Sequence, residues 1–326
     1  MKRVLNSGAS GFHDTLLSIF LVFLWISGCS GDSGYKPVDF SQTVQIEHPI
    51  VHTAGLPELR VAVAAMISPK ETFSYYQELL DFIGKNLGVS IQLIQRKTYA
   101  EVNELFPKRQ IDLAFICTGP YALGKGIYGF EALATPIVRG RPFYQSYLIV
   151  NNSSSAKSLE DLRGQEFAFT DPESNTGSLV PSYWLSEIGE NANSFFKRFT
   201  YTYSHDNSIM AVAKSLVAGA AVDGHKWEYY NHRNPYYTSM TRVIKKSIPF
   251  GSPPLVSSVY LSEPLKEKIR HLMFSMHEQD DGKHILNKLM IDRFAKPEEE
   301  WYQPVREMYK QVRVNATRDS HASKDS

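Results

Sequence analysis

Cysteine is scarce in this chain. Its 326 residues contain 2 cysteines, Cys29 and Cys117. Two cysteines cannot form the dense disulfide network that stabilises many small secreted domains. Long apolar runs are also lacking. The clearest one, residues 16–26, forms a helix of about 16 Å, whereas a bilayer core is about 30 Å thick. This run is therefore too short for a transmembrane helix.

An excess of charge of one sign is absent as well. The formal net charge is +1, from 35 basic and 34 acidic residues. No global field therefore attracts nucleic acid or an anionic membrane surface, and we expect no nucleic-acid partner. A hydrophobic content of 43% with 12% aromatic residues is enough for a folded core. Any charged ligand must therefore be recognised at a local site.

The N-terminus has the pattern of an export signal. Lys2 and Arg3 precede the apolar run, and Ile-Ser-Gly-Cys at 26–29 matches the bacterial lipobox,. We predict a lipoprotein signal peptide over 1–28, a lipid on Cys29 and a polar tether over 29–56. The alternative is an ordinary secretory signal with a chance cysteine. The predicted location is the periplasmic side of a bacterial envelope, anchored to the membrane. Cys117, in an apolar segment, is expected to be packed and unreactive.

Strand and helix patterns alternate along the rest of the chain. Buried-strand patterns at 59–64 and 111–116 alternate with helical patterns at 73–87 and 99–109,. This alternation predicts an α/β fold with mixed sheets flanked by helices. Near the C-terminus the periodicity predicts further helices, and these include 284–294 and 298–312.

Two segments have the features of crossings between two halves of the chain. They are strand patterns at 144–150 and 241–246, each followed by polar or proline-rich residues. A second lobe inserted into a discontinuous first lobe, with a hinge between them, is the layout of proteins that close on a ligand. The predicted parts are lobe 1 over 57–150 plus 245–313, lobe 2 over 151–244, and a disordered tail over 314–326.

Small polar residues gather in loops that follow predicted strands. Ligands of open α/β sheets bind beyond the carboxyl ends of the strands. The loops at 118–121, 171–178 and 204–208 lie at such ends, as does Asp223. The second loop opens a helix, where free N–H groups and the macrodipole favour an anion. An ordinary helix N-cap is the alternative interpretation of this loop.

Seven short segments, taken in order, resemble one known family. They are Ile-Asp-Leu-Ala-Phe (111–115), Thr-Gly-Pro-Tyr (118–121), Ser-Leu-Glu-Asp-Leu-Arg-Gly (158–164), Asp-Pro-Glu-Ser-Asn-Thr-Gly (171–177), Ser-His-Asp (204–206), Ala-Gly-Ala-Ala-Val-Asp (218–223) and Ile-Pro-x-Gly (248–251). With these segments the chain resembles the phosphate-, phosphite- and phosphonate-binding periplasmic lipoproteins of ABC transporters. That family has the type II periplasmic binding protein fold.

The resemblance implies a ligand site. Ser174, Asn175 and Thr176 stand where the family has a Ser-Thr-Ser anion trio. His205 matches a histidine that approaches the ligand oxygens, and its protonation is expected to tune the preference between mono- and dianion. The other ligand-binding residues that we predict are Gly177, Thr118, Tyr121, Asp223 and Ser252.

One of these positions departs from the family pattern. Relatives that bind aminoalkylphosphonates have a carboxylate where this chain has Ser252. Asp223 and Glu228 are alternative sources of negative charge. A buried ammonium group without a partner is costly, so an aminophosphonate is disfavoured relative to phosphate, phosphite or an alkylphosphonate.

The resemblance also implies a mode of action. We expect a monomeric solute-binding lipoprotein that captures a small phosphorus oxyanion by hinge closure and delivers it to an ABC permease. The alternative with the same fold is a ligand-binding subunit of a membrane sensor. An envelope hydrolase is less favoured, because the histidines lack metal-ligand spacing and no Gly-x-Ser-x-Gly elbow occurs,. We therefore predict no catalytic residues, no cofactor and no metal.

Overall fold

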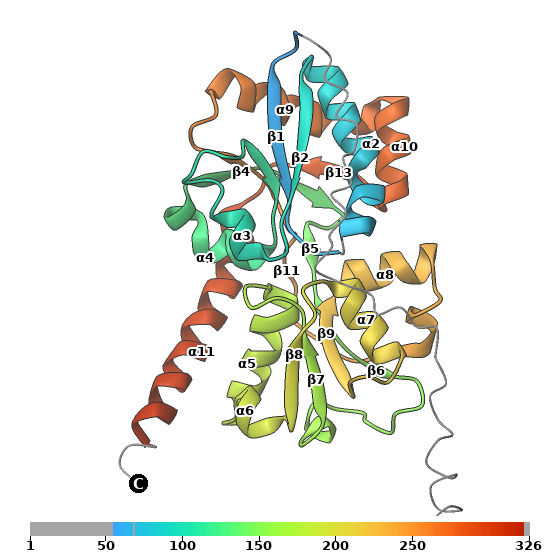
Figure 1. The fold of residues 1–326 in the computed structure, drawn as a ribbon, viewed down its shortest axis with the longest axis vertical. Coiled ribbons are helices and arrows are strands. Elements are labelled where there is room, and N and C mark those ends of the chain that lie inside the picture. Colours follow the sequence, from blue (N-terminus) through green and yellow to red (C-terminus); the bar gives the residue numbers. More distant parts are fainter. Residues whose placement is uncertain (1–54, 68, 323–326) are drawn as a thin grey trace, which may run out of the picture. The chain divides into compact units, whose positions relative to one another are not determined.

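The structure, a computed structural model, describes residues 55–67 and 69–322. They form two lobes, each built on a β-sheet with helices on both faces (Figure 1). The predicted signal peptide, the lipidation site Cys29 and nearly all of the tether lie outside the described residues. Over the described residues, no helix is both long and apolar enough to cross a membrane.

Lobe 1 is built on a mixed six-stranded sheet. In spatial order its strands are β13 (Arg293–Ala295), β4 (Phe130–Ile137), β12 (Leu255–Ser258), β3 (Leu113–Phe115), β1 (Glu58–Val63) and β2 (Ser90–Gln95). Strands β2, β1 and β3 are parallel, whereas β12 is antiparallel to both β3 and β4. The late strand β12 therefore returns the chain to the middle of a sheet that began about 200 residues earlier,.

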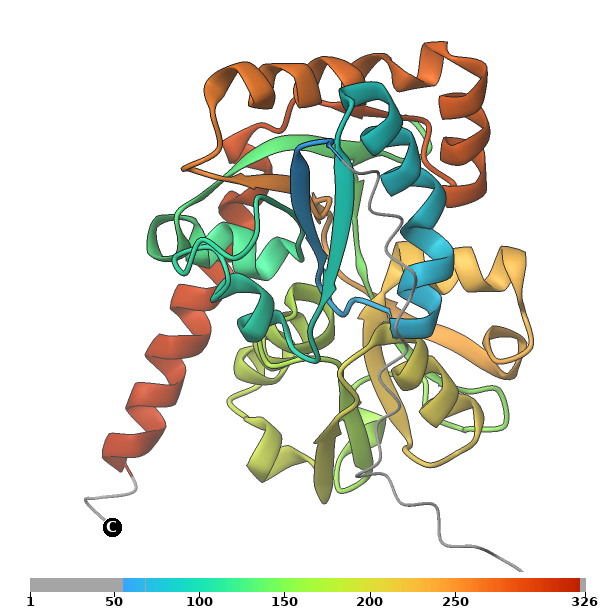
Figure 2. The same ribbon diagram turned by 45° about the horizontal axis from the view of Figure 1, so that its top comes forward.

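Strand residues of lobe 1 alternate between two cores. Leu113 and Phe115 of β3 join the core under one face, while Ala114 and Ile116 join the core under the other,. The first face is covered by α2 (Pro69–Leu87), α9 (Glu263–Ser275) and α10 (Asp280–Leu289). The second face is covered by α3 (Tyr99–Asn103) and α4 (Thr118–Tyr128). Figure 2 shows the orange helices of the first face lying across the top of the lobe.

Lobe 2 is built on a mixed five-stranded sheet. Its spatial order is β10 (Thr241–Lys246), β6 (Ser146–Asn151), β9 (Gly219–Asp223), β7 (Glu166–Phe169) and β8 (Arg198–Tyr201). The helices of this lobe are α5 (Val180–Glu187), α6 (Ala192–Phe195), α7 (His205–Ala213) and α8 (Gly224–Arg233). Short helices complete the fold at η1 (Glu160–Leu162), η2 (Asn175–Leu179), η3 (Thr238–Met240), η4 (Met276–Glu278) and η5 (Glu299–Tyr302).

The chain passes between the lobes in two adjacent segments. There β5 (Phe143–Tyr144) and β11 (Phe250–Gly251) pair as a separate antiparallel two-stranded sheet. Just beyond it, the backbone N–H of Ser247 donates to Ser146 O at 3.0 Å. The predicted crossings were the longer strand patterns at 144–150 and 241–246. The structure places β6 and β10, which form most of these patterns, side by side within the sheet of lobe 2. The exact boundaries of the lobes stay a prediction.

Three predicted helices have different ends in the structure. The helix predicted over 99–109 stops at Asn103, because Pro107 removes a backbone donor and restricts the residue before it,. The helix predicted over 284–294 ends at Leu289, since Met290 has a positive φ of 57°, and β13 follows. The last helix, α11 (Gln303–Ala322), runs ten residues past its predicted end at 312. It contacts α4 of lobe 1 and α5 of lobe 2.

Candidate ligand-binding site between the lobes

The loop that follows β7 carries the predicted anion trio. Ser174 is the N-cap of η2, and its Oγ accepts a hydrogen bond from Gly177 N at 3.0 Å,. The turn η2 is a π-helix, a rare element that is frequently found at functional sites,. Asn175, Thr176 and Gly177 are all buried in this turn. The cap that the sequence predicts therefore exists, and it fixes the orientation of the next three residues.

Gly177 is required by a close approach. A Cβ added there would lie 2.4 Å from both Cβ and Oγ1 of Thr170 at the end of β7. Real Cβ contacts are much longer, so any side chain at this position would push the turn away from the strand. The glycine therefore lets the turn pack directly on the carboxyl end of β7.

Four buried polar atoms near this turn have no partner in the described part of the protein. They are Thr176 Oγ1, Asn175 Oδ1, Tyr99 Oη and Ser252 Oγ. Each belongs to a side chain that is fully buried. An unpaired buried polar atom costs about 1–3 kcal/mol, so a set of four calls for a common partner. Three of the four are hydroxyl groups, which can donate to an oxyanion.

Contacts link several of these residues, or their chain neighbours, to other buried polar groups. Asn175 Nδ2 donates to the hydroxyl of Tyr144 at 3.1 Å. Thr118 Oγ1 donates to Gly251 O at 2.8 Å, next to Ser252. Tyr99 is tied to the loop that carries Asn175, because its backbone N–H donates to Asp171 Oδ2. We call this group the chamber and define it as Tyr99, Tyr144, Asn175, Thr176 and Ser252.

Burial keeps the tyrosines of the chamber protonated. It raises the pKa values of Tyr99 and Tyr144 well above the usual value, because an ionised phenol loses its hydration there,. Both hydroxyls therefore remain hydrogen-bond donors at any ordinary pH. Sequence reasoning missed both residues. The only local signal was that Tyr99 opens a helix and Tyr144 begins a crossing between halves.

The buried side chain of His205 is a neutral imidazole. Its Nδ1 accepts the backbone N–H of Asp223 at 3.1 Å, so in the neutral ring the hydrogen is on Nε2,. Burial lowers the pKa of His205 to about 4, against an ordinary 6.5,. Tuning of anion preference by its protonation, which the sequence suggested, is therefore disfavoured at neutral pH.

The burial of His205 predicts a loss of stability in acid. The unfolded chain takes up a proton as the pH falls below about 6.5, whereas folded His205 resists protonation down to about 4,. Within this window the folded state loses up to about 3 kcal/mol. In His205→Gln we expect the drop in unfolding free energy between pH 7 and pH 4.5 to be smaller by roughly 2–3 kcal/mol. Urea titrations of both proteins at the two pH values measure this; equal drops would contradict the assignment.

Asp223 and Cys117 border the same region. Asp223 is the N-cap of α8, and its Oδ1 accepts Lys226 N at 3.1 Å. Cys117 is buried, and its sulfur accepts backbone N–H groups of Asn175 and Gly119. Burial raises the pKa of this thiol to about 11, so Cys117 remains protonated, as expected for a packed cysteine,.

The hydroxyl of Tyr121 does not bond to the chamber residues but to the C-terminal segment. This hydroxyl donates to Glu299 Oε1 at 2.6 Å, and the ring of Tyr121 lies 4.5 Å from that of Tyr302 in an edge contact. Lys125 joins the same carboxylate oxygen at 2.5 Å. The structure therefore binds Tyr121 to the C-terminal segment, and we no longer count it among the proposed ligand contacts. The sequence did not show this, because Glu299 is 178 residues away.

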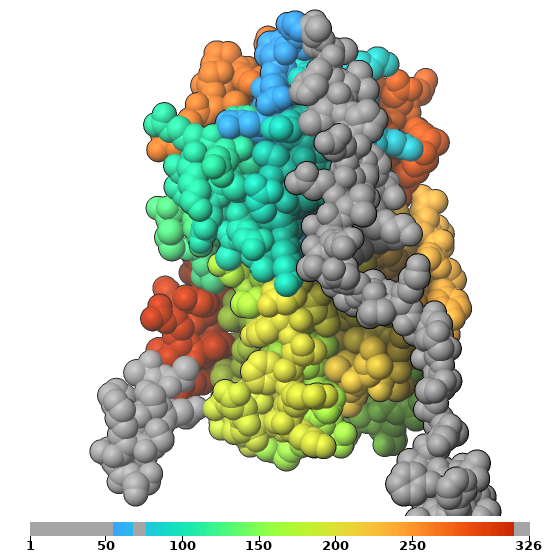
Figure 3. All heavy atoms as spheres, in the orientation of Figure 1, coloured from blue at the N-terminus to red at the C-terminus, as the bar shows by residue number. Residues whose placement is uncertain are grey.

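Hydrogen bonds join the two lobes around the chamber. Tyr99 N donates to Asp171 Oδ2 at 3.1 Å, and His205 N donates to Met66 O at 3.0 Å. Farther out, Asn103 Nδ2 donates to Glu173 Oε2 at 2.8 Å. On the face drawn in Figure 3, teal atoms of lobe 1 touch yellow atoms of lobe 2. The structure therefore shows the lobes in contact, with the chamber residues buried where they meet.

Comparison with known proteins shows which family this chain matches. Residues 61–302 match the family described as ABC transporter, phosphonate, periplasmic substrate-binding protein. The chain belongs to this family. The resemblance and the two-lobed fold predicted from the sequence are confirmed. A periplasmic substrate-binding role, as opposed to an enzymatic one, is the role of this family.

Relatives of the family cover most of the chain. It is 27% identical to the Phosphonates-binding periplasmic protein of Escherichia coli over 230 residues, 69% of this chain and 68% of that protein. It is 29% identical to the Phosphate-import protein PhnD of Mycolicibacterium smegmatis over 227 residues, 65% of each chain.

Solved structures support the fold. A binding protein component of an ABC phosphonate transporter from Pseudomonas aeruginosa superposes with a TM-score of 0.76 at 24% identity, over 80% of this chain and 88% of that one. PhnD1 of Prochlorococcus marinus, in complex with methylphosphonate, gives a TM-score of 0.70 at 21% identity, over 78% and 98%.

Proposed function

We propose that this periplasmic binding protein captures a small phosphorus oxyanion in the chamber between its lobes. The observation that carries the proposal is the set of buried polar atoms without a partner among the described residues, which includes Thr176 Oγ1 and Asn175 Oδ1 at a helix start. Hydroxyl donors and the helix dipole match the negative oxygens of a phosphoryl group. Relatives named for phosphonate, phosphate and phosphite support this ligand class.

Every predicted residue except Tyr121 has a place in this proposal. Ser174 and Gly177 shape the turn, while Asn175 and Thr176 face the ligand. His205 donates from Nε2, with Nδ1 held by the Asp223 backbone. Ser252 and Tyr99 contribute hydroxyls from lobe 1, and Thr118 supports Ser252 through its bond to Gly251 O. Neutral groups thus provide most of the recognition.

Closure of the lobes is the proposed capture step. The chamber residues come from both lobes, so a ligand that bonds to both favours the closed arrangement over an open one. The hydrogen bonds from Tyr99 N to Asp171 and from His205 N to Met66 form only when the lobes meet. Bending at the segments beside β5 and β11 accounts for the motion, since these segments connect the lobes.

Calorimetry tests the proposed ligand class. Isothermal titration of the mature protein with phosphate, phosphite and methylphosphonate should show micromolar or tighter binding of at least one of them. Sulfate serves as a tetrahedral control anion and is expected to bind at least tenfold more weakly. Binding weaker than about millimolar for all three phosphorus anions would contradict the proposal.

Delivery to a permease and a lipid anchor complete the proposal. The family description implies an ABC transporter as partner, and we propose that the closed, loaded protein presents the oxyanion to its membrane subunits. The lipobox at 26–29 supports a lipid on Cys29. Expression in a bacterium with labelled palmitate should label the wild-type protein in the membrane fraction. Cys29→Ser should remain unlabelled; equal labelling of both would contradict the anchor.

A further inference from the structure

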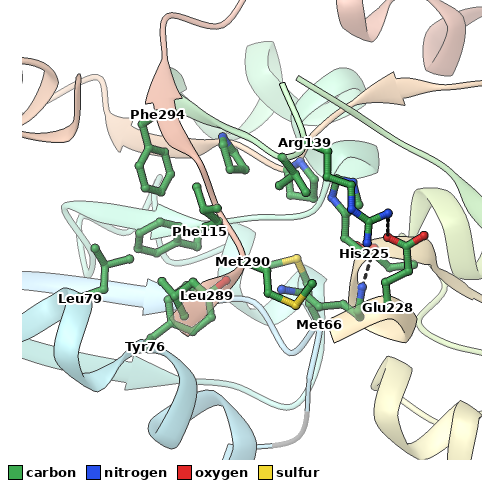
Figure 4. Close-up of a pocket in the computed structure, with 16 residues that line it drawn as sticks. Met66, Tyr76, Leu79, Phe115, Arg139, His225, Glu228, Leu289, Met290 and Phe294 are labelled. Carbon is green, nitrogen blue, oxygen red and sulfur yellow. Dashed lines mark hydrogen bonds and ion pairs between the residues drawn. The ribbon is translucent and has the colours of Figure 1, made fainter. Parts of the chain in front are cut away.

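A cavity lies beside the chamber residues. Figure 4 shows it, lined by side chains of both lobes. Its volume is about 70 Å³, which is several times the space that one water needs. Most of its wall is apolar and comes from lobe 1. We call it the side pocket and define its apolar wall by Leu79, Phe115, Val138, Met290 and Phe294.

The side pocket adjoins the chamber. His225 lines the pocket, and its ring lies 6.1 Å from that of Tyr144, centroid to centroid. Tyr144 in turn accepts the hydrogen bond of Asn175 Nδ2. Asp223 also lines the pocket, while its backbone N–H holds His205. A group attached to phosphorus in the chamber can therefore extend into this apolar space.

Glu228, Arg139 and one oxygen of Asp223 are engaged by protein groups at the pocket, and Lys226, which also lines it, has an interaction partner as well. Glu228 Oε2 pairs with Arg139 Nη1 at 2.9 Å, and Glu228 Oε1 accepts the hydroxyl of Tyr147 at 2.6 Å. Asp223 Oδ1 caps α8. Burial lowers the pKa of His225, which keeps this ring neutral,. An ammonium group entering the pocket would have to compete with these pairs for a carboxylate.

We propose that the side pocket receives an uncharged, apolar substituent of a few carbon atoms, so that the preferred ligand is an organophosphonate rather than phosphate or phosphite. This inference rests on the proposed function, since it requires the phosphoryl group to bind in the chamber. The apolar wall would remove the substituent from water, and each buried CH₂ group strengthens binding by about fourfold. The residues of the wall come from α2, β3, the residue after β4, the residue after α10, and β13, which are far apart in the sequence.

A ligand series and a filling variant test the proposal. Calorimetry would compare phosphate, methylphosphonate, propylphosphonate and 2-aminoethylphosphonate on the wild-type protein. Propylphosphonate is expected to bind roughly tenfold tighter than methylphosphonate, because it buries two more CH₂ groups. In Met290→Trp the larger side chain fills the pocket, and this advantage should disappear while methylphosphonate binding stays within about threefold. Ile127→Trp, at a residue that is 74% exposed on α4, is the matched control and should keep the advantage.

The possible results of this binding series distinguish failure of the side-pocket proposal from failure of the proposed function. Tighter binding of phosphate than of either alkylphosphonate would overturn the side-pocket proposal and leave the proposed function standing. Tighter binding of 2-aminoethylphosphonate than of propylphosphonate would contradict the proposal that the substituent is uncharged. If Met290→Trp still bound propylphosphonate about tenfold tighter than methylphosphonate, the propyl group would not lie in the side pocket. If Met290→Trp binds no methylphosphonate, the same comparison is made with Val138→Phe, at another residue of the apolar wall. Failure of every phosphorus anion to bind would remove both proposals together.

Discussion

Thr176→Val is expected to weaken methylphosphonate binding roughly 10- to 100-fold without destabilising the protein. The hydroxyl of Thr176 is buried and has no protein partner, so its loss breaks no internal hydrogen bond. A hydrogen bond to a charged group contributes about 1.5–3 kcal/mol, which gives the expected loss of affinity. Valine has nearly the same shape, so packing is preserved. The ligand-free unfolding free energy should stay equal or rise by about 1 kcal/mol, because an unpaired buried hydroxyl is removed.

Thr238→Val is the matched control for that variant. Thr238 is equally buried, but its Oγ1 donates to Pro235 O at 3.3 Å, away from the chamber. This substitution should cost about 1 kcal/mol of stability and leave the affinity unchanged. The two variants therefore have opposite signatures in calorimetry and urea titration. If Thr176→Val lost stability and kept its affinity, Thr176 would be a structural residue and not a ligand contact.

Gly119→Ala is expected to keep the lobes apart. Gly119 is the second residue of α4 in lobe 1, and a Cβ there would lie 2.4 Å from Glu173 O and 3.1 Å from Asn175 N in lobe 2. The backbone of the loop cannot yield without disturbing the cap of Ser174. A hundredfold fall in the population of the closed state would raise the apparent Kd about a hundredfold. X-ray scattering should then show little compaction on adding ligand.

Gly126→Ala provides the control for this second variant. Gly126 lies on the same helix, and an added Cβ would have nothing within 4 Å. Alanine there favours the helix by about 1 kcal/mol and should leave binding and compaction as in the wild type. Compaction of Gly119→Ala to the wild-type extent, at wild-type affinity, would refute the proposed closed arrangement.

Features that depend on neighbouring residues could be predicted from the sequence. The loop at 171–178 has a hydroxyl cap, a glycine and a preceding apolar strand, and each of these acts on its immediate neighbours. The structure accordingly has Ser174 as the cap and buries Asn175, Thr176 and Gly177. The overall α/β class was predictable for the same reason, because strand and helix periodicities are local patterns.

Local sequence patterns could not predict the contacts between the lobes. Tyr99 is the first residue of α3, a position that favours packing as much as ligand binding, and only the approach of lobe 2 encloses its hydroxyl. Tyr121 shows the converse error, since its hydroxyl meets a glutamate near the C-terminus. The side pocket depends on Met290 in a left-handed conformation, which ends a helix that periodicity alone would continue. Such features depend on tertiary packing and not on local propensity.

A crystal structure of the mature protein with methylphosphonate tests the central claim most directly. We expect the phosphonate oxygens to lie within about 3.2 Å of Thr176 Oγ1 and the hydroxyl of Tyr99, with the carbon directed towards His225. A phosphonate bound outside the chamber, with Thr176 and Tyr99 still unpartnered, would contradict it.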